Sequence, residues 1–344
     1  MRYPDFLKKN DVIGFVAPSF GCSVEPYFSG FSEAKKRFRR MGYRIEQGPN
    51  CLEDKGIGKS NTPEKCAEEL NEMYCSESNR VLISCGGGEL MCEDLNYLDF
   101  DRIKAAKPKW YMGYSDNTNF TYTLTTICDV ASVYGPCAAA FGMRPWHKAL
   151  RDAFGILEGK TLDAASYDLW QMESLKDEEH PFEPYNLTMP VNIIGIRPDG
   201  SRGDVTAKGR LIGGCMDILI NLLGTEFDHT REFVSRYAAD GILWYLESCD
   251  LTVLSMRRAM WQMKNAGWFE HASGFIFGRP LHYGEKIMGL DQYNAVTEPL
   301  KDLNVPVILD ADIGHLPPMM PLINGSIATA SVKDEKLAVH MELR

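Results

Sequence analysis

The sequence lacks the features by which several classes of protein are recognised. Its 344 residues contain no internal repeat, no low-complexity tract and no long apolar run. The apolar run nearest the start, VIGFVA, is shorter than the core of a signal peptide and far shorter than a membrane span. We therefore expect no membrane partner and a cytoplasmic protein. The net charge is −10, and the sequence contains no long basic stripe, so we also expect no nucleic-acid partner.

Cysteine-based metal-binding patterns are absent as well. The ten cysteines include no CxxC pair and no Cys/His cluster at the spacing of a zinc site. In a chain of this length they are interpreted as reduced, mostly buried thiols. We expect neither a metal nor a cofactor.

The first half of the chain alternates between short apolar runs and amphipathic stretches. The apolar runs predict strands, and they lie at 11–19, 43–48, 79–88, 109–115 and 131–136. The stretches between them predict helices, including one over 95–107. Strands joined by helices are typical of parallel βαβ units, so residues 1–165 are predicted to form an open parallel-sheet α/β domain.

Residues 166–206 have a different character. The stretch MESLKDEEHPFEPYNLTMP is rich in Pro, Glu and Asp and shows no period, which predicts a connector or a mobile surface segment. Order returns over 207–344, where strands and helices alternate again and 325–344 predicts a closing β-hairpin. The predicted class is α/β, with a second α/β domain over 207–344.

Ligands of open α/β sheets bind beyond the carboxyl ends of the strands. The polar or glycine positions that directly follow the predicted apolar runs are Ser19, Gly86, Gly87, Gly88, Ser115, Glu247, Arg279 and His315. A serine, an acid and a histidine occur among them, in the order Ser, Glu, His. These are the residue types of a hydrolytic triad.

Ser115 lies in the pentapeptide GYSDN, which approximates the nucleophile elbow G-x-S-x-G. A sharp turn from strand to helix would expose its hydroxyl where the helix dipole and free N–H groups favour a developing anion. The alternative is that Ser115 or Asp116 only caps the following helix.

The glycine run Gly86, Gly87 and Gly88 frees backbone N–H groups and admits a close approach to the main chain. With the N–H of Asp116 it could form an oxyanion hole, but it could equally cradle a phosphate or be a plain tight turn. It is not a GxGxxG motif, so a dinucleotide site is not indicated.

His315 stands between Gly314 and a proline-rich loop, and it fits a strand end better than its rival His282. A lone histidine can equally be a structural hydrogen-bonding residue. Glu247 follows the apolar run ILWYL and needs a partner or access to water. A histidine N–H would suit it, because an acid in this position fixes the histidine tautomer in triads.

Three alternatives remain open on the residues alone. Asp310 and Asp312, close to His315 in the sequence, could supply metal ligands. Cys85 and Cys249 could act as nucleophiles if their pKa were lowered, although buried thiols need no such role. The chain could also be a non-catalytic protein whose glycine turns bind an anion.

The blocks CGGG, KPKWYMGYSDNTNF, GRLIGGCMDILINLLGT, LES and GHLPPMMPLINGSIATA occur in this order. Together they resemble the LD-carboxypeptidase family, which includes the microcin C self-immunity peptidases, over about residues 7–335. The resemblance implies an N-terminal α/β domain, a smaller strand-rich C-terminal domain and an active site in the cleft between them. It also implies that members are commonly homodimers.

The resemblance further implies a triad of Ser115, Glu247 and His315, with an oxyanion hole from the N–H groups of Gly87 and Asp116. Gly86 and Gly88 would then lie beside the substrate. We expect a metal-independent serine carboxypeptidase or amide hydrolase. Its small substrate would be a short peptide or an aminoacyl-nucleotide conjugate.

Two positions depart from the family pattern and bear on the substrate. Cys85 stands where many muropeptide-cleaving members have an arginine, and Cys215 stands where asparagine is frequent. The stretch SYDLWQMESLKDEE resembles a tryptophan-plus-acid segment of the microcin-immunity branch. We therefore expect Trp170 to contact substrate, with packing in the protein's own core as the alternative. Hydrolysis of muropeptide tetrapeptides is the alternative activity.

Overall fold

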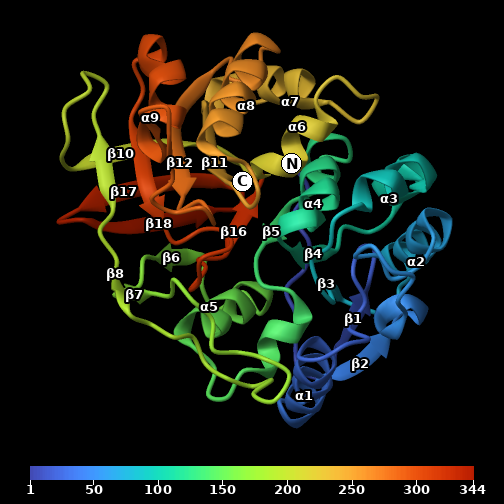
Figure 1. The fold of residues 1–344 in the computed structure, drawn as a ribbon. Coiled ribbons are helices and arrows are strands. Elements are labelled where there is room, and N and C mark those ends of the chain that lie inside the picture. Colours follow the sequence, from blue (N-terminus) through green and yellow to red (C-terminus); the bar gives the residue numbers. More distant parts are fainter. The chain divides into compact units, whose positions relative to one another are not determined.

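The computed structural model describes residues 1–344, which divide into two compact units (Figure 1). Unit 1 comprises Met1–Thr161 and Glu173–Asn186, and unit 2 comprises Leu162–Met172 and Leu187–Arg344. The chain therefore passes from one unit to the other three times. The predicted α/β class with two domains is confirmed. None of the helices has the length and apolar character needed to cross a lipid bilayer.

The strands of unit 1 form a parallel sheet in the order β5-β4-β3-β1-β2. They are β1 (Val12–Val16), β2 (Arg44–Gln47), β3 (Val81–Ser84), β4 (Trp110–Gly113) and β5 (Ser132–Tyr134). All residues of the three strands β3, β4 and β5 are buried, which is why their sequences are nearly continuous apolar runs.

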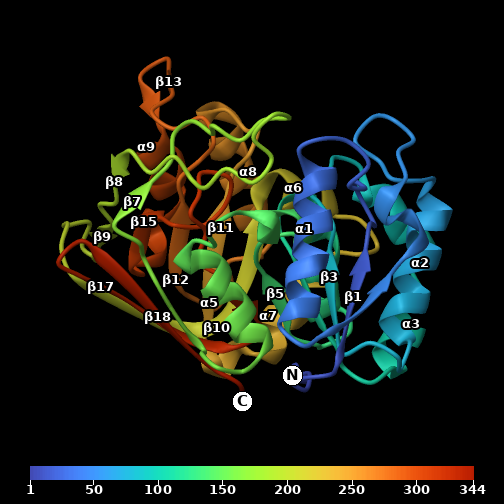
Figure 2. The same cartoon turned by 90° about the horizontal axis from the view of Figure 1, so that it is seen from below.

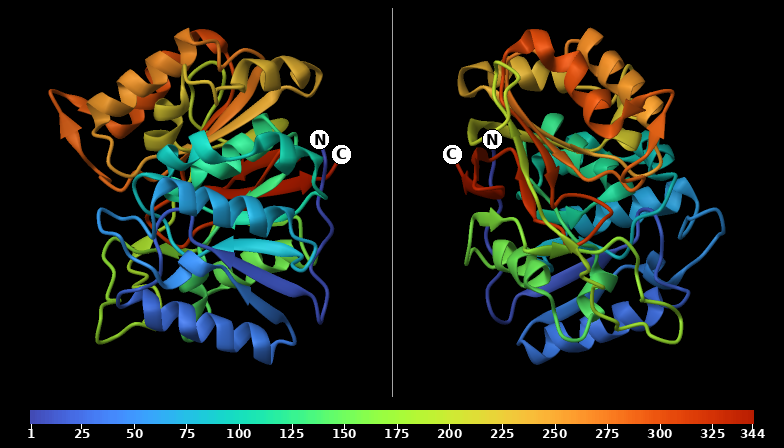
Figure 3. Two further views of the ribbon diagram at one scale, coloured as in Figure 1. Left: turned by 90° about the vertical axis from the view of Figure 1, so that its right-hand side faces the viewer. Right: turned by 60° about the vertical axis from the view of Figure 1, so that its left-hand side comes forward.

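Helices cover both faces of this sheet. Figures 2 and 3 show α1 on one side of the strands and α2 on the other, as right-handed crossovers in opposite directions require. The α-helices of unit 1 are α1 (Tyr27–Arg40), α2 (Pro63–Cys75), α3 (Phe100–Ala105), α4 (Thr118–Thr126) and α5 (Lys148–Leu157). The 3₁₀ turns are η1 (Pro49–Leu52), η2 (Met91–Tyr97), η3 (Ser115–Asn117) and η4 (Ala138–Gly142).

The single helix predicted over 95–107 is wrong, because two elements, η2 and α3, occupy this stretch. Asp99 separates them: its side chain accepts a hydrogen bond from the N–H of Arg102 at 2.9 Å and caps α3.

Unit 2 is built on an eight-stranded mixed sheet in the order β6-β18-β17-β10-β11-β12-β15-β9. The four central strands are parallel: β10 (Val205–Cys215), β11 (Ile242–Glu247), β12 (Ala272–Gly278) and β15 (Val307–Ala311). The antiparallel strands at the two edges are β6 (Asp163–Ala165), β9 (Ile194–Ile196), β17 (Ile327–Lys333) and β18 (Lys336–Glu342). The predicted closing hairpin is the β17–β18 pair.

The helices of unit 2 connect its parallel strands, and Figure 1 shows α6, α8 and α9 along the same side of the sheet. They are α6 (Met216–Leu222), α7 (Thr230–Arg236), α8 (Val253–Asn265), α9 (Gln292–Thr297), η5 (Ala238–Asp240) and η6 (Glu298–Leu303). Short strands complete the unit: β7 (Leu169–Trp170), β8 (Met189–Pro190), β13 (Lys286–Ile287), β14 (Leu290–Asp291) and β16 (Leu322–Asn324).

The segment 166–206 contributes to both units. Its stretch Glu173–Asn186 belongs to unit 1, where the N–H of Arg144 donates to the carbonyl of Phe182 at 2.9 Å and the Arg144 guanidinium lies 4.2 Å from the Phe182 ring centre. The flanking residues belong to unit 2 and include β7, β8 and β9. The three strands have two or three residues each, too few to show a period in the sequence.

Candidate active site

Ser115 occupies a strained turn between β4 and α4. It is half-buried, and its φ of +61° lies in the left-handed region that non-glycine residues seldom adopt. Its N–H donates to the Tyr134 hydroxyl at 3.3 Å. Backbone strain of this kind is held at functional turns by the surrounding structure, and it is the geometry of a nucleophile elbow.

The neighbours of Ser115 fix this turn. A Cβ atom on Gly113 would lie 2.7 Å from Asn117 Cγ, so the position requires glycine. Asn117 Nδ2 donates to the carbonyls of Gly86 at 2.8 Å and Tyr114 at 3.2 Å, which ties the turn to the glycine run. The cap positions before η3 and α4 are held by Tyr114 and Asn117, not by Ser115. This arrangement favours the elbow over the helix cap.

Asp116 is buried and its carboxylate is engaged within unit 1. It accepts hydrogen bonds from the Ser19 hydroxyl, from the Met91 N–H at 2.9 Å and from Asn119 Nδ2 at 3.0 Å. Burial raises the pKa of Asp116, and these hydrogen bonds only partly offset the rise. The Asp116 N–H lies in the first turn of η3, where helical N–H groups lack partners within the helix.

The glycine run faces the serine. A Cβ atom on Gly87 would lie 3.5 Å from Ser115 Cβ and 3.6 Å from Ser115 Oγ. The Gly87 carbonyl accepts from the Phe20 N–H at 2.8 Å, whereas the Gly87 N–H makes no hydrogen bond within the protein. Gly88 has a φ of +137°, and a Cβ atom there would lie 1.9 Å from Ser19 Oγ. Gly87 therefore presents its backbone beside Ser115, and Gly88 makes the turn possible.

Glu247 and His315 are paired in unit 2. Glu247 ends the buried strand β11, and its Oε2 lies 2.8 Å from Nδ1 of His315, which follows β15 by four residues. The Glu247 side chain is 0% exposed and that of His315 is 13% exposed. A Cβ atom on Gly314 would lie 2.4 Å from Glu247 Oε2, so glycine at this position gives the carboxylate its room.

The surroundings of His315 favour its charged form. Burial, the largest single influence, lowers the pKa of His315. The negative charge of Glu247 and the hydrogen bonds that His315 makes with Cys249 and Glu247 raise it by more, so that the pKa of His315 stands well above its ordinary value. In hydrolytic triads a buried carboxylate stabilises the imidazolium in the same way.

Asp217, in the first turn of α6, was not singled out by the sequence. Its carboxylate accepts from the N–H groups of Cys249 at 3.0 Å, Asp250 at 2.7 Å and Leu251 at 3.1 Å. The thiol of Cys215 lies 3.4 Å from it. Asp217 thus fixes the loop that follows Glu247. The sequence offered one signal for Asp217: it is an acid in the first turn of a helix that directly follows a strand.

The aspartates considered for a metal site have other partners. The buried Arg279 donates to the Asp312 carboxylate and, at 2.7 Å, to the Asp310 carbonyl. Asp312 also accepts from the Tyr167 N–H at 2.7 Å, and the Asp310 carboxylate accepts from the Tyr293 hydroxyl at 2.7 Å. No group of three or more His, Cys, Asp or Glu side chains is placed to hold a metal ion. The geometry favours the Glu–His pair over a metal centre.

The thiols near these residues have raised pKa values. Burial and the neighbouring thiols raise the pKa of Cys85 well above its ordinary value, and burial is the main cause of the rise at Cys249. A raised thiol pKa disfavours a cysteine nucleophile. His282, the rival of His315, is exposed at the surface.

Trp170 lies in the interior of unit 2 and is 3% exposed. Its indole N–H donates to the Pro190 carbonyl at 3.0 Å, the Tyr283 ring packs edge-on at 5.0 Å, and the Arg279 guanidinium lies 4.8 Å from the indole centre. The next residue is tied to the loop that carries His315, because the N–H of Gln171 donates to the Pro317 carbonyl at 2.8 Å. In this structure Trp170 therefore has the packing in the protein's own core that was the alternative to substrate contact, and it is linked to the His315 loop within one unit.

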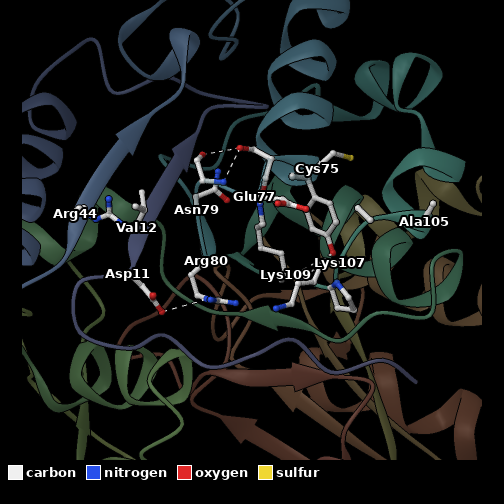
Figure 4. Close-up of a pocket in the computed structure, with 15 residues that line it drawn as sticks. Asp11, Val12, Arg44, Cys75, Glu77, Asn79, Arg80, Ala105, Lys107 and Lys109 are labelled. Atoms are coloured by element: carbon white, nitrogen blue, oxygen red, sulfur yellow. Dashed lines mark hydrogen bonds and ion pairs between the residues drawn. The ribbon is translucent and has the colours of Figure 1, made fainter.

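Unit 1 also contains a large polar pocket, about 650 Å³ in volume (Figure 4). It is lined at the amino ends of β1, β3 and β4, whereas Ser115 follows a carboxyl end. Two of its cations are engaged within the unit: Arg80 pairs with Asp11 at 3.4 Å, and the Lys109 ammonium donates to the carbonyls of Met73 and Ser76. This pocket is not the candidate site.

Comparison with known proteins gives related sequences and one shared fold. The microcin C7 self-immunity protein MccF of Escherichia coli is 26% identical over 92% of this chain and 89% of its own. A Bacillus subtilis protein assigned as a murein peptide carboxypeptidase is 24% identical over 98% of this chain and 93% of its own. The MccF-like protein of Bacillus anthracis has the same fold, with a TM-score of 0.82, 22% identity and 100% of both chains covered.

MccF has also been solved in complex with aspartyl sulfamoyl adenosine, and that structure matches with a TM-score of 0.80, 23% identity, and 99% and 98% of the two chains covered. The model of the LD-carboxypeptidase N-terminal domain matches residues 13–135, which include Ser115 and the glycine run. The model of the C-terminal domain matches residues 208–330, which include Glu247 and His315. With both domain models matched in order over most of its length, the chain belongs to the LD-carboxypeptidase family.

Proposed function

We propose that the protein is a serine-type carboxypeptidase or amide hydrolase in which Ser115, His315 and Glu247 act as a triad. The observation that carries the proposal is the buried Glu247–His315 pair. A carboxylate at Nδ1 fixes the tautomer of a histidine and directs Nε2 to the opposite side of the ring, where a nucleophile is activated. The strained turn at Ser115, which faces Gly87, adds support from unit 1.

In the proposed reaction Ser115 attacks the scissile carbonyl while His315 accepts the hydroxyl proton and later returns it to the leaving amine. Glu247 stabilises the imidazolium that forms. The N–H groups of Gly87 and Asp116 would bind the oxyanion, and one such donor is typically worth about 3 kcal/mol of transition-state stabilisation. The mechanism requires that Ser115 of unit 1 reach His315 of unit 2 in the enzyme–substrate complex.

Two substrate classes are supported, and both are short and peptide-like. The similarity to MccF, which has been solved with aspartyl sulfamoyl adenosine, and the tryptophan-plus-acid segment favour an aminoacyl-nucleotide conjugate. The murein peptide carboxypeptidase relative favours a muropeptide tetrapeptide. We favour the first class, with a nucleobase stacking on Trp170. Because the indole is 3% exposed, stacking would require it to become accessible when the substrate binds.

A serine-directed fluorophosphonate probe tests the nucleophile without knowledge of the substrate. The wild-type protein should be labelled at Ser115, as located by peptide mass spectrometry, and Ser115→Ala should abolish labelling. Ser235→Ala, at an exposed serine of α7, is the matched control and should be labelled like wild type. A protein that binds ligands without catalysis would leave the probe unreacted, and this result would refute the triad.

A product assay identifies the substrate. The panel contains a muropeptide tetrapeptide and an acyl-sulfamoyl adenylate, with cleavage followed by mass spectrometry. Cleavage should be lost in Ser115→Ala and should persist in a chelator. Loss of cleavage only in the chelator would favour a metal hydrolase in place of the triad. Preference for the tetrapeptide would replace the nucleotide conjugate as the proposed substrate.

A further inference from the structure

A short loop of unit 1 carries an isoleucine in a conformation that isoleucine avoids. Gly56, Ile57 and Gly58 have φ values of +80°, +47° and +70°. Gly56 forms an antiparallel bridge with Lys59, so Ile57 and Gly58 are the two central residues of a tight hairpin turn. Such a turn prefers Asn-Gly or Asp-Gly, and a β-branched residue with positive φ is an outlier. Ile57 therefore holds this position at a conformational cost.

The loop is a defined turn. The N–H of Lys55 donates to the Lys59 carbonyl at 2.9 Å, and the N–H of Lys59 donates to the Gly56 carbonyl at 3.1 Å. The Lys59 side chain is almost fully buried, and its ammonium pairs with the Glu93 carboxylate. These contacts fix the backbone, so the strain at Ile57 is maintained by the surrounding structure.

The side chain of Ile57 gains nothing from the protein in return. It is 76% exposed, among the most exposed of the large apolar residues of the chain. An apolar side chain that is both strained and exposed has no role in the stability of the fold. Strained residues cluster at functional sites, and an exposed apolar group beside such a site is suited to bury against a ligand.

The loop packs directly on the glycine run that faces the proposed nucleophile. A Cβ atom on Gly88 would lie 2.8 Å from the Gly58 carbonyl oxygen, so the two backbones are in contact. The N–H of Ser60 donates to the Ser19 carbonyl at 2.7 Å, and the Ser19 hydroxyl donates to Asp116. The Ile57 turn is thus joined by one contact to Gly88, the neighbour of Gly87, and by a chain of two hydrogen bonds through Ser19 to Asp116, the neighbour of Ser115.

We infer that Ile57 is a specificity residue that contacts an apolar group of the substrate bound at Ser115. The group is an aliphatic side chain or the flat face of an aromatic ring, carried by the substrate away from its scissile bond. This inference rests on the proposed hydrolase function. It predicts a substrate preference that is determined by a residue other than those of the triad and the oxyanion hole.

Ile57→Asn tests the inference, because asparagine tolerates the left-handed region and removes the apolar side chain. The starting compound is the substrate that the wild type cleaves fastest. Two versions of it are prepared that differ only in carrying leucine or alanine at one position, and such a pair is made for each side of the scissile bond. At one position the wild type should prefer leucine, and Ile57→Asn should reduce this preference roughly tenfold through KM. Its melting temperature should rise, since the strain is relieved.

Glu335→Gly is the matched control. Asp334 and Glu335, with φ values of +49° and +59°, form the turn between β17 and β18, and the change creates the preferred Asp-Gly sequence there. This turn lies at the end of β10 that is remote from Glu247. Val332, close to the turn, pairs with the first residue of β10, whereas Glu247 pairs with the last residue of that strand. The control should also gain stability but should keep the wild-type leucine preference.

The fluorophosphonate probe distinguishes this inference from the function on which it rests. The probe is small, so wild type and Ile57→Asn should be labelled at the same rate. Normal labelling with an unchanged leucine preference in Ile57→Asn would overturn the inference and leave the proposed function standing. An unlabelled wild type would overturn both. Ile57→Gly, which also keeps the turn, should repeat the loss, and an unchanged preference in this variant would equally overturn the inference.

Discussion

Replacing Glu247 by glutamine removes one buried charge from beside His315 and preserves the shape of the side chain. The carboxylate oxygen lies 2.8 Å from Nδ1 and the Glu247 side chain is 0% exposed, so solvent screens the pair little. Two unit charges about 4 Å apart attract by about 4 kcal/mol at an effective dielectric constant of 20. This attraction develops fully only when His315 becomes charged in the transition state. Since each 1.36 kcal/mol is a factor of ten in rate, Glu247→Gln should lower kcat roughly a thousandfold.

The pH dependence provides a second readout with a definite sign. His315 must be neutral to accept a proton, and its pKa is held well above the ordinary value, mainly by Glu247 acting against burial. The rising limb of kcat/KM should therefore lie at higher pH than for an ordinary histidine. Glu247→Gln lowers the pKa of His315, so this limb should move to lower pH. A merely structural acid would leave the limb in place.

The same pair contributes to stability in a defined pH window. Because the pKa of His315 is higher in the folded than in the unfolded protein, its stabilisation is fully present below about pH 6.5 and is lost as the pH rises through the folded value. The difference in melting temperature between wild type and Glu247→Gln should therefore be largest in mildly acidic buffer.

The matched control for Glu247→Gln is Asp163→Asn. Nδ1 of His340 lies 2.6 Å from an Asp163 oxygen, but both side chains are more than half exposed, so the same chemistry is screened by water. The rate of fluorophosphonate labelling and the pH profile of hydrolysis are measured for both variants. If Glu247→Gln were labelled at the wild-type rate, or if the rising limb of its kcat/KM profile stayed at the wild-type pH, the role assigned to the Glu247–His315 pair would be refuted.

Gly87→Val should slow labelling of Ser115 more than it lowers the melting temperature, because its Cβ meets Ser115 at an ordinary contact distance of 3.5 Å. Gly88→Ala should instead lower the melting temperature, since its Cβ would lie 1.9 Å from Ser19 Oγ. Trp170→Ala should raise KM for nucleotide-bearing substrates and barely affect an aliphatic muropeptide, besides costing about 3–5 kcal/mol of stability. Asp217→Ala should lower kcat and shift the pH limb of His315 by releasing the loop after Glu247, and an unchanged pH profile would make Asp217 purely structural.

The sequence predicted the parts of the site that depend on strand ends. A buried parallel strand is a continuous apolar run, so the residue that follows it can be located without knowledge of the packing. Glu247 and Ser115 were located in this way. In the structure, His315 pairs with Glu247, and the glycine run faces Ser115. His315 was preferred over His282 because of its position after an apolar run, and its role as the base stays a prediction.

Long-range partners could not be predicted in this way. The charge and the ring that cover Trp170 come from residues more than 100 positions away in the chain, Arg279 and Tyr283, so its polar neighbourhood in the sequence gave no sign of burial. Asp217 acts through three N–H groups of a distant loop, which no spacing rule connects to it. The strain at Ile57 is a property of φ angles and leaves no mark on residue periodicity.

The threefold passage of the chain between the two units constrains how the protein can be synthesised and divided. Unit 1 lacks its final stretch, Glu173–Asn186, until after β6 and β7 of unit 2 have been translated. A nascent chain of 161 residues would therefore hold the nucleophile turn in an incomplete unit, and the usual domain-by-domain order of folding during translation cannot apply strictly. Any attempt to express the two units as separate polypeptides must carry 173–186 with the first, by a deliberate rearrangement of the gene, because no single cut in the chain separates them.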